Sequence, residues 1–393
     1  MKTLAELESW GLALRRREGG LPHASAAPGH KTPRLTGCGD STIREVTRIL
    51  EEQAIKRGIQ RNADSIPLSI VSDNSQVRGI VTLDVPTGRI DAIQAKAVIL
   101  ATEGHQGLWS KPSDGSGTGS ALAIAAGIDL KGMEITPRHP LTIRDCGIHI
   151  PLDVLGSGGR IRRENGDDVG PEEVLEGEPC VLDLRQMDAD AKVWFSQTSM
   201  RIMDRLGIDI SKDVIPLSPG VAYTTGGAPS DAQGRVLFQG HTTEGLPAEL
   251  WHTGLYAAGR SAHTGMHGSN ALPGNLLLDD LVSGKTAGEH ASEWATEIKF
   301  GGNAQIEEAV KGESARISSI MGGDGMAVAK FHSKLTSAIS SGSSEEASLA
   351  EVRAIKDKGI TLTDTSSIMN TEMVEALRLV GLASVAEAIL TSG

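Results

Sequence analysis

The fold is decided by the stretch from Ser65 to Gly104, which reads SIPLSIVSDNSQVRGIVTLDVPTGRIDAIQAKAVILATEG. Apolar and polar residues alternate through three short runs, and the turn sequences DNSQ and PTGR separate them. This period of two, interrupted by Gly, Pro, Asn and Asp, predicts three strands in a meander. The continuous apolar run that begins AVIL then predicts one fully buried strand. An α/β fold is therefore expected.

Glycine follows two of the apolar runs. The predicted buried strand ends in ATEG, and GLYAAGR occupies residues 254–260. Glycine at a strand end lets backbone approach a bound nucleotide closely, but glycine is equally common in ordinary turns. A nucleotide site and an ordinary strand-to-loop turn both remain possible interpretations. Gly115, Gly117 and Gly119 precede the helix-like SALAIAAG, where they form either an anion-binding helix start or a flexible turn. The spacing is not G-x-G-x-x-G, because residue 120 is serine.

Helical periodicity accounts for much of the remaining chain. Residues 3–14 and 41–57 predict amphipathic helices, the second with Ser41 as its amino-terminal cap. Between residues 137 and 215, PCVLDL predicts a strand and AKVWFSQTSMRIMDRLG a helix. About three or four Ala-rich helices are expected between 277 and 391, with the linker-like SSGSSEEAS at 340–348 before the last.

Composition and charge exclude several functional classes. Lys and Arg number 38 against 50 Asp and Glu, a net charge of −12 that argues against nucleic acid as a partner. No run approaches the roughly 18 apolar residues of a membrane span, and the acidic start MKTLAELESWG is unlike a signal peptide. The three cysteines lack C-x-x-C spacing, so no disulfide framework and no metal site is expected, and a reducing, cytoplasmic location is the default.

Several stretches, in order along the chain, resemble the flavoprotein subunits of succinate dehydrogenase and fumarate reductase, a family that includes L-aspartate oxidase. MHGSNALPGNLLLDDLVSGKTAG at 266–288 resembles the family's H-G-A-N-R-L-G-G-N-S-L-L-D, and GLYAAGR resembles G-L-Y-A-A-G-E. YTTGGAPSDAQGRV at 223–236 is similar to the family's Gly-Gly hairpin, and VLDLRQM at 181–187 to the strand that closes a capping domain. TLTDTSSIMNTE at 361–372 is similar to D-T-S-S-x-x-N-T.

The resemblance implies three domains. A partial FAD-binding domain of the two-dinucleotide-binding type would cover residues 1–136 and 216–290, a shortened capping domain 137–215, and a helical carboxy-terminal domain 291–393. FAD is the implied cofactor, held without a covalent bond because the family's flavin-linking His has no counterpart. The family's first strand and G-x-G-x-x-G, which support the FAD pyrophosphate, also have no counterpart.

The implied partners follow from the same resemblance. They are an iron–sulfur subunit and a second chain that supplies the missing dinucleotide-binding segment. Contact with a membrane, at its inner face, would come only through such partners.

Candidate site residues also come from the resemblance. His139, in HPLTI, stands where the family's substrate-binding His begins H-P-T-G, and a loop histidine with satisfied hydrogen bonds is the alternative. The candidate cofactor-binding residues are Ala101, Thr102, Gly104, Gly117, Gly119, Gly226, Gly227, Gly259, His267, Gly268, Asn270, Asn275, Leu276 and Leu277.

Other family positions carry residues that do not suit the chemistry. Glu103 replaces a Gly of A-T-G-G, and Arg260 replaces the Glu of A-A-G-E. Hydride transfer involving a dicarboxylate needs cationic clamps and a proton donor, so no catalytic residue is assigned where the family's polar groups are replaced. The replaced positions are Pro151, Leu152, Leu155, Ala222 and Ala271. The cations of RIRREN at 160–165 fit a solvated turn better than an anion site.

Three interpretations compete. The first is an FAD-dependent oxidoreductase subunit of a succinate or fumarate complex, which serves electron transfer in the tricarboxylic acid cycle and needs a partner chain to bind flavin. The second is a catalytically degenerate relative that keeps the fold for assembly, or binds a neutral ligand in a more apolar pocket. The third is an incomplete piece of a longer homologue. The first is preferred, with activity expected only in a complex.

Overall fold

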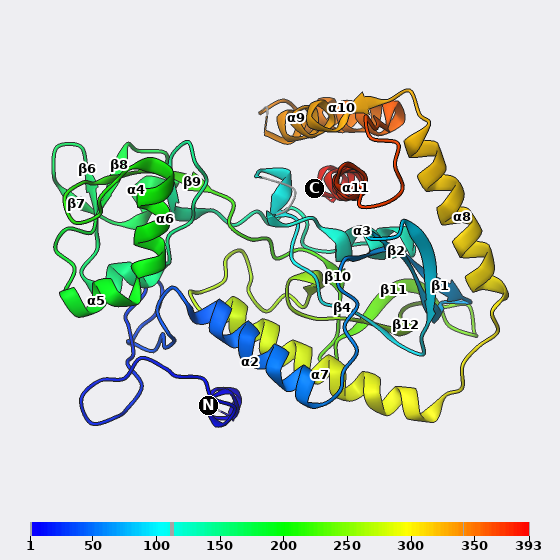
Figure 1. The fold of residues 1–393 in the computed structure, drawn as a ribbon, viewed down its shortest axis with the longest axis horizontal. Helices are drawn as coiled ribbons and strands as arrows, with labels where there is room; N and C mark the ends of the chain where they lie inside the picture. The colour runs from blue at the N-terminus through cyan, green and yellow to red at the C-terminus, as the bar shows by residue number, and fades with distance from the viewer. Residues whose placement is uncertain (1, 111–113, 341, 393) are drawn as a thin grey trace. The chain divides into compact units, whose positions relative to one another are not determined.

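The structure is a computed structural model that describes residues 2–110, 114–340 and 342–392. Two compact units make up the chain. Unit 1 comprises Met1–Arg61, Pro137–Ala222 and Ala271–Leu278, and unit 2 comprises Asn62–Thr136, Tyr223–Asn270 and Asp279–Gly393. Their helices and strands carry the labels of Figure 1.

Unit 1 contains a five-stranded sheet of order β5-β9-β8-β6-β7, in which every neighbouring pair is antiparallel. Its core is apolar and includes Leu141, Leu182 and Ile202. The strands are β5 (His139–Ile143), β6 (Arg160–Arg163), β7 (Asp168–Val169), β8 (Cys180–Asp183) and β9 (Ile215–Gly220). The helices are α1 (Lys2–Ser9), α2 (Thr42–Lys56), η3 (Leu152–Ser157), α4 (Pro171–Leu175), α5 (Ala189–Trp194) and α6 (Ser196–Leu206).

Several predictions in unit 1 are confirmed and others need correction. The predicted strand PCVLDL is β8, and the helix predicted at 41–57 is α2, although the Ser41 side chain makes no capping hydrogen bond. The helix predicted at 3–14 is shorter, because the chain turns at Gly11 with φ +109°. The long helix predicted after residue 190 breaks at Phe195, where φ is −115° and ψ 23°.

The prediction of a turn at RIRREN was wrong for its first four residues, which form strand β6. The sheet position brings its arginines against carboxylates. Arg160 and Arg162 bind Asp168 at 2.7 Å each, and Arg162 also binds Asp183 at 2.7 Å. Arg160 and Arg162 are therefore engaged in internal ion pairs.

Unit 2 is built on a six-stranded sheet of order β1-β2-β12-β11, with β3 paired to β2 and β4 paired to β12. The β4–β12 pair is parallel, whereas β1–β2, β2–β3 and β11–β12 are antiparallel. The sheet strands are β1 (Ser65–Asp73), β2 (Gln76–Asp84), β3 (Arg89–Gln94), β4 (Val98–Leu100), β11 (Arg235–His241) and β12 (Pro247–Ala257). Shorter strands are β10 (Ala228–Pro229), β13 (Ala262–His263), β14 (Met326–Ala327) and β15 (Ile360–Thr361).

The predicted meander is confirmed as β1, β2 and β3. Asn74 and Ser75 have φ of 50° and 56°, as a tight two-residue hairpin turn requires, and Gly88 at φ 72° serves the next turn. The prediction that the following strand is fully buried was wrong for one face. In β4, Leu100 is 3% exposed but Ile99 is 37% exposed.

The helices of unit 2 cover the sheet and build a second layer beyond it. They are η1 (Gln106–Leu108), α3 (Thr118–Ala125), η4 (Gly259–Ser261), α7 (Asn275–Glu297, in unit 2 from Asp279), α8 (Ala304–Met321), α9 (Val328–Ser340), α10 (Glu345–Lys358) and α11 (Thr371–Thr391). Among the described residues, five long helices therefore replace the three or four expected between 277 and 391. The linker predicted at 340–348 is wrong for Ser340, which ends α9, and for residues 345–348, which begin α10 with Ser344 as cap; residue 341 lies outside the described residues.

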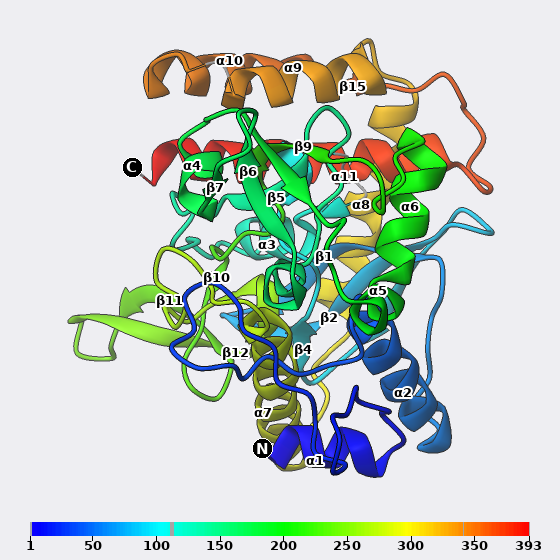
Figure 2. The same cartoon turned by 90° about the vertical axis from the view of Figure 1, so that its left-hand side faces the viewer.

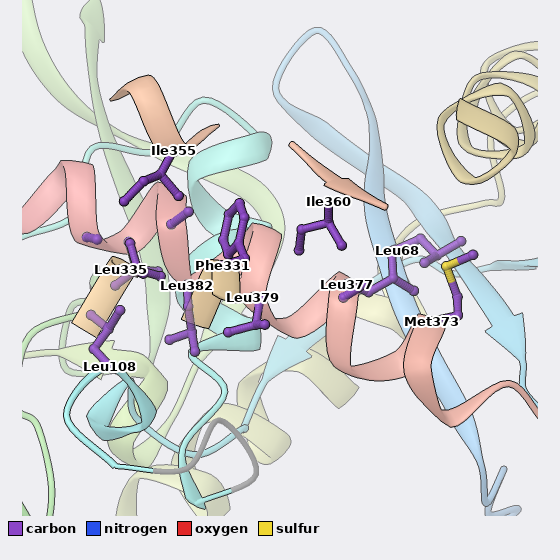
Figure 3. Packing of buried hydrophobic residues seen from close by; sticks show 14 of the residues in the cluster. Leu68, Leu108, Phe331, Leu335, Ile355, Ile360, Met373, Leu377, Leu379 and Leu382 are labelled. Atoms are coloured by element: carbon purple, nitrogen blue, oxygen red, sulfur yellow. The ribbon is translucent and has the colours of Figure 1, made fainter. Parts of the chain in front are cut away.

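Helix α11 is the centre of the largest core. It lies between the α9–α10 pair and α3 (Figure 1, Figure 2). Leu379, Leu382 and Val385 are completely buried, as expected of a helix that is apolar on most sides. Figure 3 shows Leu382 close to Leu335 and Phe331 of α9. The same core reaches the meander through residues such as Leu68.

The motif TLTDTSSIMNTE has a structural role in this unit. Asp364 and Ser366 form a turn before α11, and the cap of the helix is Asn370, whose Oδ1 accepts from the Met373 N–H at 2.7 Å. The Asn370 Nδ2 donates to the carbonyls of Asp364 and Ser366 at 2.9 and 2.7 Å. Met369 N–H donates to Val85 O at 2.9 Å, which ties this loop to the meander. Within the described ranges, no helix is long and apolar enough to cross a membrane.

Candidate functional site

The carboxyl ends of β4 and β12 lie side by side in unit 2, with several glycines around them. The N–H of Ala258, directly after β12, donates to the carbonyl of Leu100 at 2.9 Å. Ligands of α/β sheets bind beyond the carboxyl ends of parallel strands. This end of the β4–β12 pair is therefore the candidate site.

Thr102 joins three segments at this site. Its N–H donates to Ser261 Oγ at 2.8 Å, and Ser261 Oγ lies 2.9 Å from the carbonyl of Thr102, to which it donates in turn. Thr102 Oγ1 accepts from the N–H of Gly119 at 2.9 Å. The end of β4, the turn η4 and the first turn of α3 are thus bonded into one junction.

Close approach within the chain explains the glycines of this junction. A Cβ at Gly119 would lie 2.7 Å from Thr102 Oγ1, and a Cβ at Gly227 would lie 2.6 Å from the Ser261 carbonyl oxygen. Distances this short leave no room for a side chain. The structure brings the following predicted residues together in unit 2: Ala101, Thr102, Gly104, Gly117, Gly119, Gly226, Gly227 and Gly259.

Glu103 occupies the position that the sequence marked as an anion site. Its Oε1 accepts from Ser116 Oγ at 2.6 Å and from the Ser116 N–H at 3.3 Å, directly before α3. Burial acts to raise the pKa of this carboxyl, but the Ser116 hydrogen bonds, helped by the charge of Arg378, outweigh it and lower the pKa. Gly115 to Gly119 therefore hold the chain's own carboxylate, which a ligand phosphate would have to displace.

His105 is a buried residue that the sequence did not reveal. Its N–H donates to Thr224 Oγ1 at 3.0 Å, and its Nε2 is buried with no hydrogen-bond partner among the described residues. Burial lowers the pKa of His105 to about 4, so the ring is neutral near pH 7. A single histidine after a strand end forms no recognisable sequence motif. Only the structure shows that His105 lies buried between two glycine-rich segments.

Charged groups line the start of η4 and the unit 2 part of α7. The Arg260 guanidinium lies 3.5 Å from Asp280 Oδ2, and its Nε is buried with no partner among the described residues. Burial raises the pKa of Asp280 although Arg260 acts to lower it. His267 Nε2 lies 3.1 Å from Asp279 Oδ2. The arginine that replaces a family glutamate is thus accompanied by a carboxylate.

The remaining predicted residues have different surroundings. Gly268 has φ +56° and open space where a Cβ would stand, and Asn270 accepts a hydrogen bond from the Tyr223 hydroxyl. Asn275, Leu276 and Leu277 belong to unit 1, where they begin α7.

His139, the predicted substrate-binding residue, belongs to unit 1. Its Nε2 donates to the carbonyl of Ile150 at 2.8 Å, and its ring packs edge-on against His149 with centroids 5.6 Å apart. Burial, with a smaller contribution from His149, lowers the pKa of His139 to about 4 against the opposing effect of the Ile150 carbonyl. The ring is therefore neutral near pH 7. Leu152 and Leu155, where the family carries polar groups, pack against the apolar core of the same unit.

Comparison with known proteins places the chain in a family. The model of a family described as FAD binding domain matches residues 1–277. The fumarate reductase flavoprotein subunit of Escherichia coli (strain K12) is 26% identical, with 99% of this chain and 71% of that protein covered. The succinate dehydrogenase flavoprotein subunit of Rickettsia bellii (strain RML369-C) is also 26% identical, with 96% of this chain and 70% of that protein covered.

Solved structures agree on the fold. A mutant FrdA of E. coli quinol fumarate reductase superposes with a TM-score of 0.87 at 24% identity, over 99% of this chain and 74% of that one. The mixed α/β architecture with a helical carboxy-terminal region is thus the fumarate reductase flavoprotein fold. FAD is the cofactor of the family that the sequence match identifies. The chain belongs to the FAD-binding family of succinate dehydrogenase and fumarate reductase flavoprotein-like proteins.

Proposed function

We propose that this chain is the FAD-binding subunit of an oxidoreductase of the succinate dehydrogenase and fumarate reductase type, and that it binds flavin only with a partner chain. The observation that carries the proposal is the junction of Thr102, Ser261 and Gly119 at the carboxyl ends of β4 and β12. FAD would supply the two-electron redox chemistry. An iron–sulfur subunit is the proposed electron partner, and the complex would lie at the inner face of a membrane.

The residues present fit the flavin ring of FAD but not its pyrophosphate. Thr225 Oγ1 and Arg260 Nε are buried polar atoms with no partner among the described residues, and both adjoin glycines of the predicted cofactor site. Buried polar groups normally have a partner, so these two atoms are available to a polar ligand. Glu103, however, fills the anion position at α3. The pyrophosphate therefore needs backbone from elsewhere, which is the reason for proposing a partner chain.

This chain's own groups would position the flavin and exclude water from it. Gly226, Gly227 and Gly259 let the chain approach itself closely at Gly132, Ser261 and Asp280, which fixes the backbone around the proposed flavin site, and the apolar clusters beneath β12 keep that side dry. Arg260 places a positive charge, balanced by Asp280, where the ring would be held. A fixed positive charge favours a ligand that gains negative charge on reduction.

A catalytically degenerate relative is the second candidate. Its specific support is His139, which is neutral and bonded through Nε2 to a backbone carbonyl, with Leu152 and Leu155 packed into a core. A neutral ring cannot act as a cationic clamp for a carboxylate. Such a protein would keep the fold for assembly or for binding a neutral ligand.

The visible absorption spectrum distinguishes the two candidates. The chain would be purified alone and after coexpression with a neighbouring reading frame that carries G-x-G-x-x-G, because bound oxidised flavin absorbs near about 450 nm. A flavin spectrum only after coexpression, with bleaching by succinate, is expected. Thr102→Val should weaken that spectrum because it removes the bond to Gly119, whereas Thr87→Val, at an exposed turn, should leave it unchanged. Flavin that succinate does not bleach would favour the degenerate relative, and no flavin in either preparation would reject the proposal.

A further inference from the structure

Aromatic side chains gather in unit 2 where strand β12 packs against helix α7. The chain has only five tryptophans and two tyrosines, yet Trp251, Trp294 and Tyr256 lie together here with His290. The ring centroid of Trp251 is 5.0 Å from that of Trp294 and 5.7 Å from that of Tyr256. Rings in direct contact have centroids about 4.5 to 7 Å apart, so the three rings form a continuous series.

This series leads from the surface into the interior. Trp294 and Trp251 are half-buried, whereas Tyr256 is 0% exposed. Apart from the sulfur side chains, indole and phenol rings give up a single electron most readily among the side chains. Rings in contact also exchange an electron readily, because their π orbitals lie close together. An electron can therefore pass from Tyr256 through Trp251 to Trp294.

A proton acceptor is already in place at the buried end. An oxidised phenol is a strong acid and must release its hydroxyl proton. The Tyr256 hydroxyl oxygen lies 2.9 Å from His290 Nδ1, which accepts the hydroxyl hydrogen when the ring proton is on Nε2. Burial raises the pKa of Tyr256 to about 12, so the phenol keeps its proton until the ring is oxidised.

The two tryptophans have no such base. Trp251 Nε1 donates to the carbonyl of Leu255 at 3.1 Å, and a backbone carbonyl does not take up a proton. Trp294 Nε1 is buried with no hydrogen-bond partner among the described residues. The Arg235 guanidinium lies 5.6 Å from the Trp251 centroid and repels positive charge on that ring, although Asp231 at 2.6 Å from Arg235 offsets part of this effect. Positive charge is therefore favoured to leave both indoles.

We propose that Trp294, Trp251 and Tyr256 form a relay that traps one-electron oxidants, with Tyr256 as the end point and His290 as the proton acceptor. This function goes beyond the proposed flavin chemistry and does not depend on it. The oxidant takes one electron from Trp294, which is refilled from Trp251 and then from Tyr256. The hydroxyl proton of Tyr256 moves to His290 Nδ1. The oxidant is reduced by one electron, and a neutral tyrosyl radical and an imidazolium remain.

Pulse radiolysis of the full chain with the azide radical tests the relay. The azide radical removes one electron from an indole and becomes azide, and the absorption bands of the tryptophanyl and tyrosyl radicals are then followed in time. Tyr256→Phe removes the end point. Tyr223→Phe is the matched control, because Tyr223 is the second of the two tyrosines and its hydroxyl is bonded to Asn270 instead. Circular dichroism checks that the variants fold.

Two further variants test the path and the proton step. His290→Phe keeps a ring but removes the base, so it should slow tyrosyl formation by at least about tenfold, as loss of a general base typically does. Trp251→Phe interrupts the series of rings and leaves Tyr256 and His290 in place. It should also slow tyrosyl formation, and it tests the relay even where Tyr256→Phe does not fold.

In the wild type, the tyrosyl band should rise as the tryptophanyl band decays, at a rate that does not depend on protein concentration. Tyr256→Phe should abolish this rise, and Tyr223→Phe should leave it unchanged. The relay is overturned if the wild type shows no rise, if the rise survives Tyr256→Phe or is lost in Tyr223→Phe, if Trp251→Phe leaves its rate unchanged, or if the rate is proportional to protein concentration. An unchanged rate in His290→Phe would overturn the proton step.

Discussion

Glu103 shows how one substitution changes a site. Where the family has glycine, this carboxylate accepts hydrogen bonds from the Oγ and N–H of Ser116, which precedes the cap residue Gly117 of α3. A negative group at a helix amino terminus is favourable because unpaired N–H groups point toward it. The substitution therefore places the chain's own carboxylate beside the start of α3.

Replacing Glu103 by Gln should lower the free energy of unfolding by roughly 1 kcal/mol, since a charge-assisted hydrogen bond to Ser116 becomes a neutral one. The folded pKa of Glu103 is lowered, so its contribution is present above the unfolded pKa and is lost as the pH falls through the folded value. Urea unfolding at neutral pH measures the change. Glu51→Gln, which removes an exposed ion pair with Arg61, is the control and should change little. Equal losses in both variants would contradict this role of Glu103.

Individual site residues were predicted unevenly. The glycines at 104, 119 and 227 were found because motif resemblance marks them, and their tight contacts explain why glycine stands there. Thr102 was named, but its link to Ser261 joins residues far apart in sequence, which no local pattern encodes. His105 was missed for the same reason, since its partner Thr224 comes from a distant segment.

At the scale of elements, the loop before α11 is tied down mainly by Asn370. Asn370→Ala removes a capping acceptor and two donations to loop carbonyls, so the free energy of unfolding should fall by about 1 to 2 kcal/mol. Guanidinium unfolding measures it. Asn303→Ala is the matched control, because Asn303 precedes α8 without making a capping hydrogen bond. A loss at Asn303 as large as that at Asn370 would show that the cap is not the cause.

The elements that the sequence predicted best are those fixed by local rules. The meander was found because alternation and turn residues agree, and α2 because its apolar positions recur at helical spacing. The failures are tertiary. The residues near RIRR in the sequence do not indicate that β8 will pair with it. The helix break at Phe195 depends on the burial of its ring in the core of unit 1. The exposure of Ile99 in β4 likewise depends on how other elements pack over the sheet.

At the scale of the whole molecule, buried histidines link stability to pH. Burial lowers the pKa of His105 and of His139 to about 4, while an unfolded histidine titrates near about 6.5. Between these two pKa values the unfolded chain binds more protons than the folded chain. The stabilisation that comes from keeping the histidines neutral is therefore complete above about pH 6.5 and decreases as the pH falls toward 4. Each histidine should account for up to about 3 kcal/mol.

Unfolding of the wild type and of His105→Gln at about pH 5 and about pH 7.5 tests this linkage. On acidification, the free energy of unfolding of the variant should fall less than that of the wild type, because glutamine does not take up the proton that His105 binds in the unfolded chain. His241→Gln, at an exposed position, provides the reference. If acidification lowers the free energy of unfolding of His105→Gln as much as that of the wild type, His105 is not the source of the pH dependence.

The core around α11 has a consequence for synthesis on the ribosome. Leu68 and Val81 of the meander share that core with Phe331 and Leu382, which are translated about 250 to 300 residues later. At a translation rate of roughly 5 to 20 residues per second, α9 and α11 are synthesised on the order of 15 to 60 seconds after the meander, and its apolar face stays uncovered until then. During that interval the nascent chain exposes a surface that chaperones recognise. The yield of folded protein should therefore depend on elongation speed and chaperone supply more than its final stability suggests.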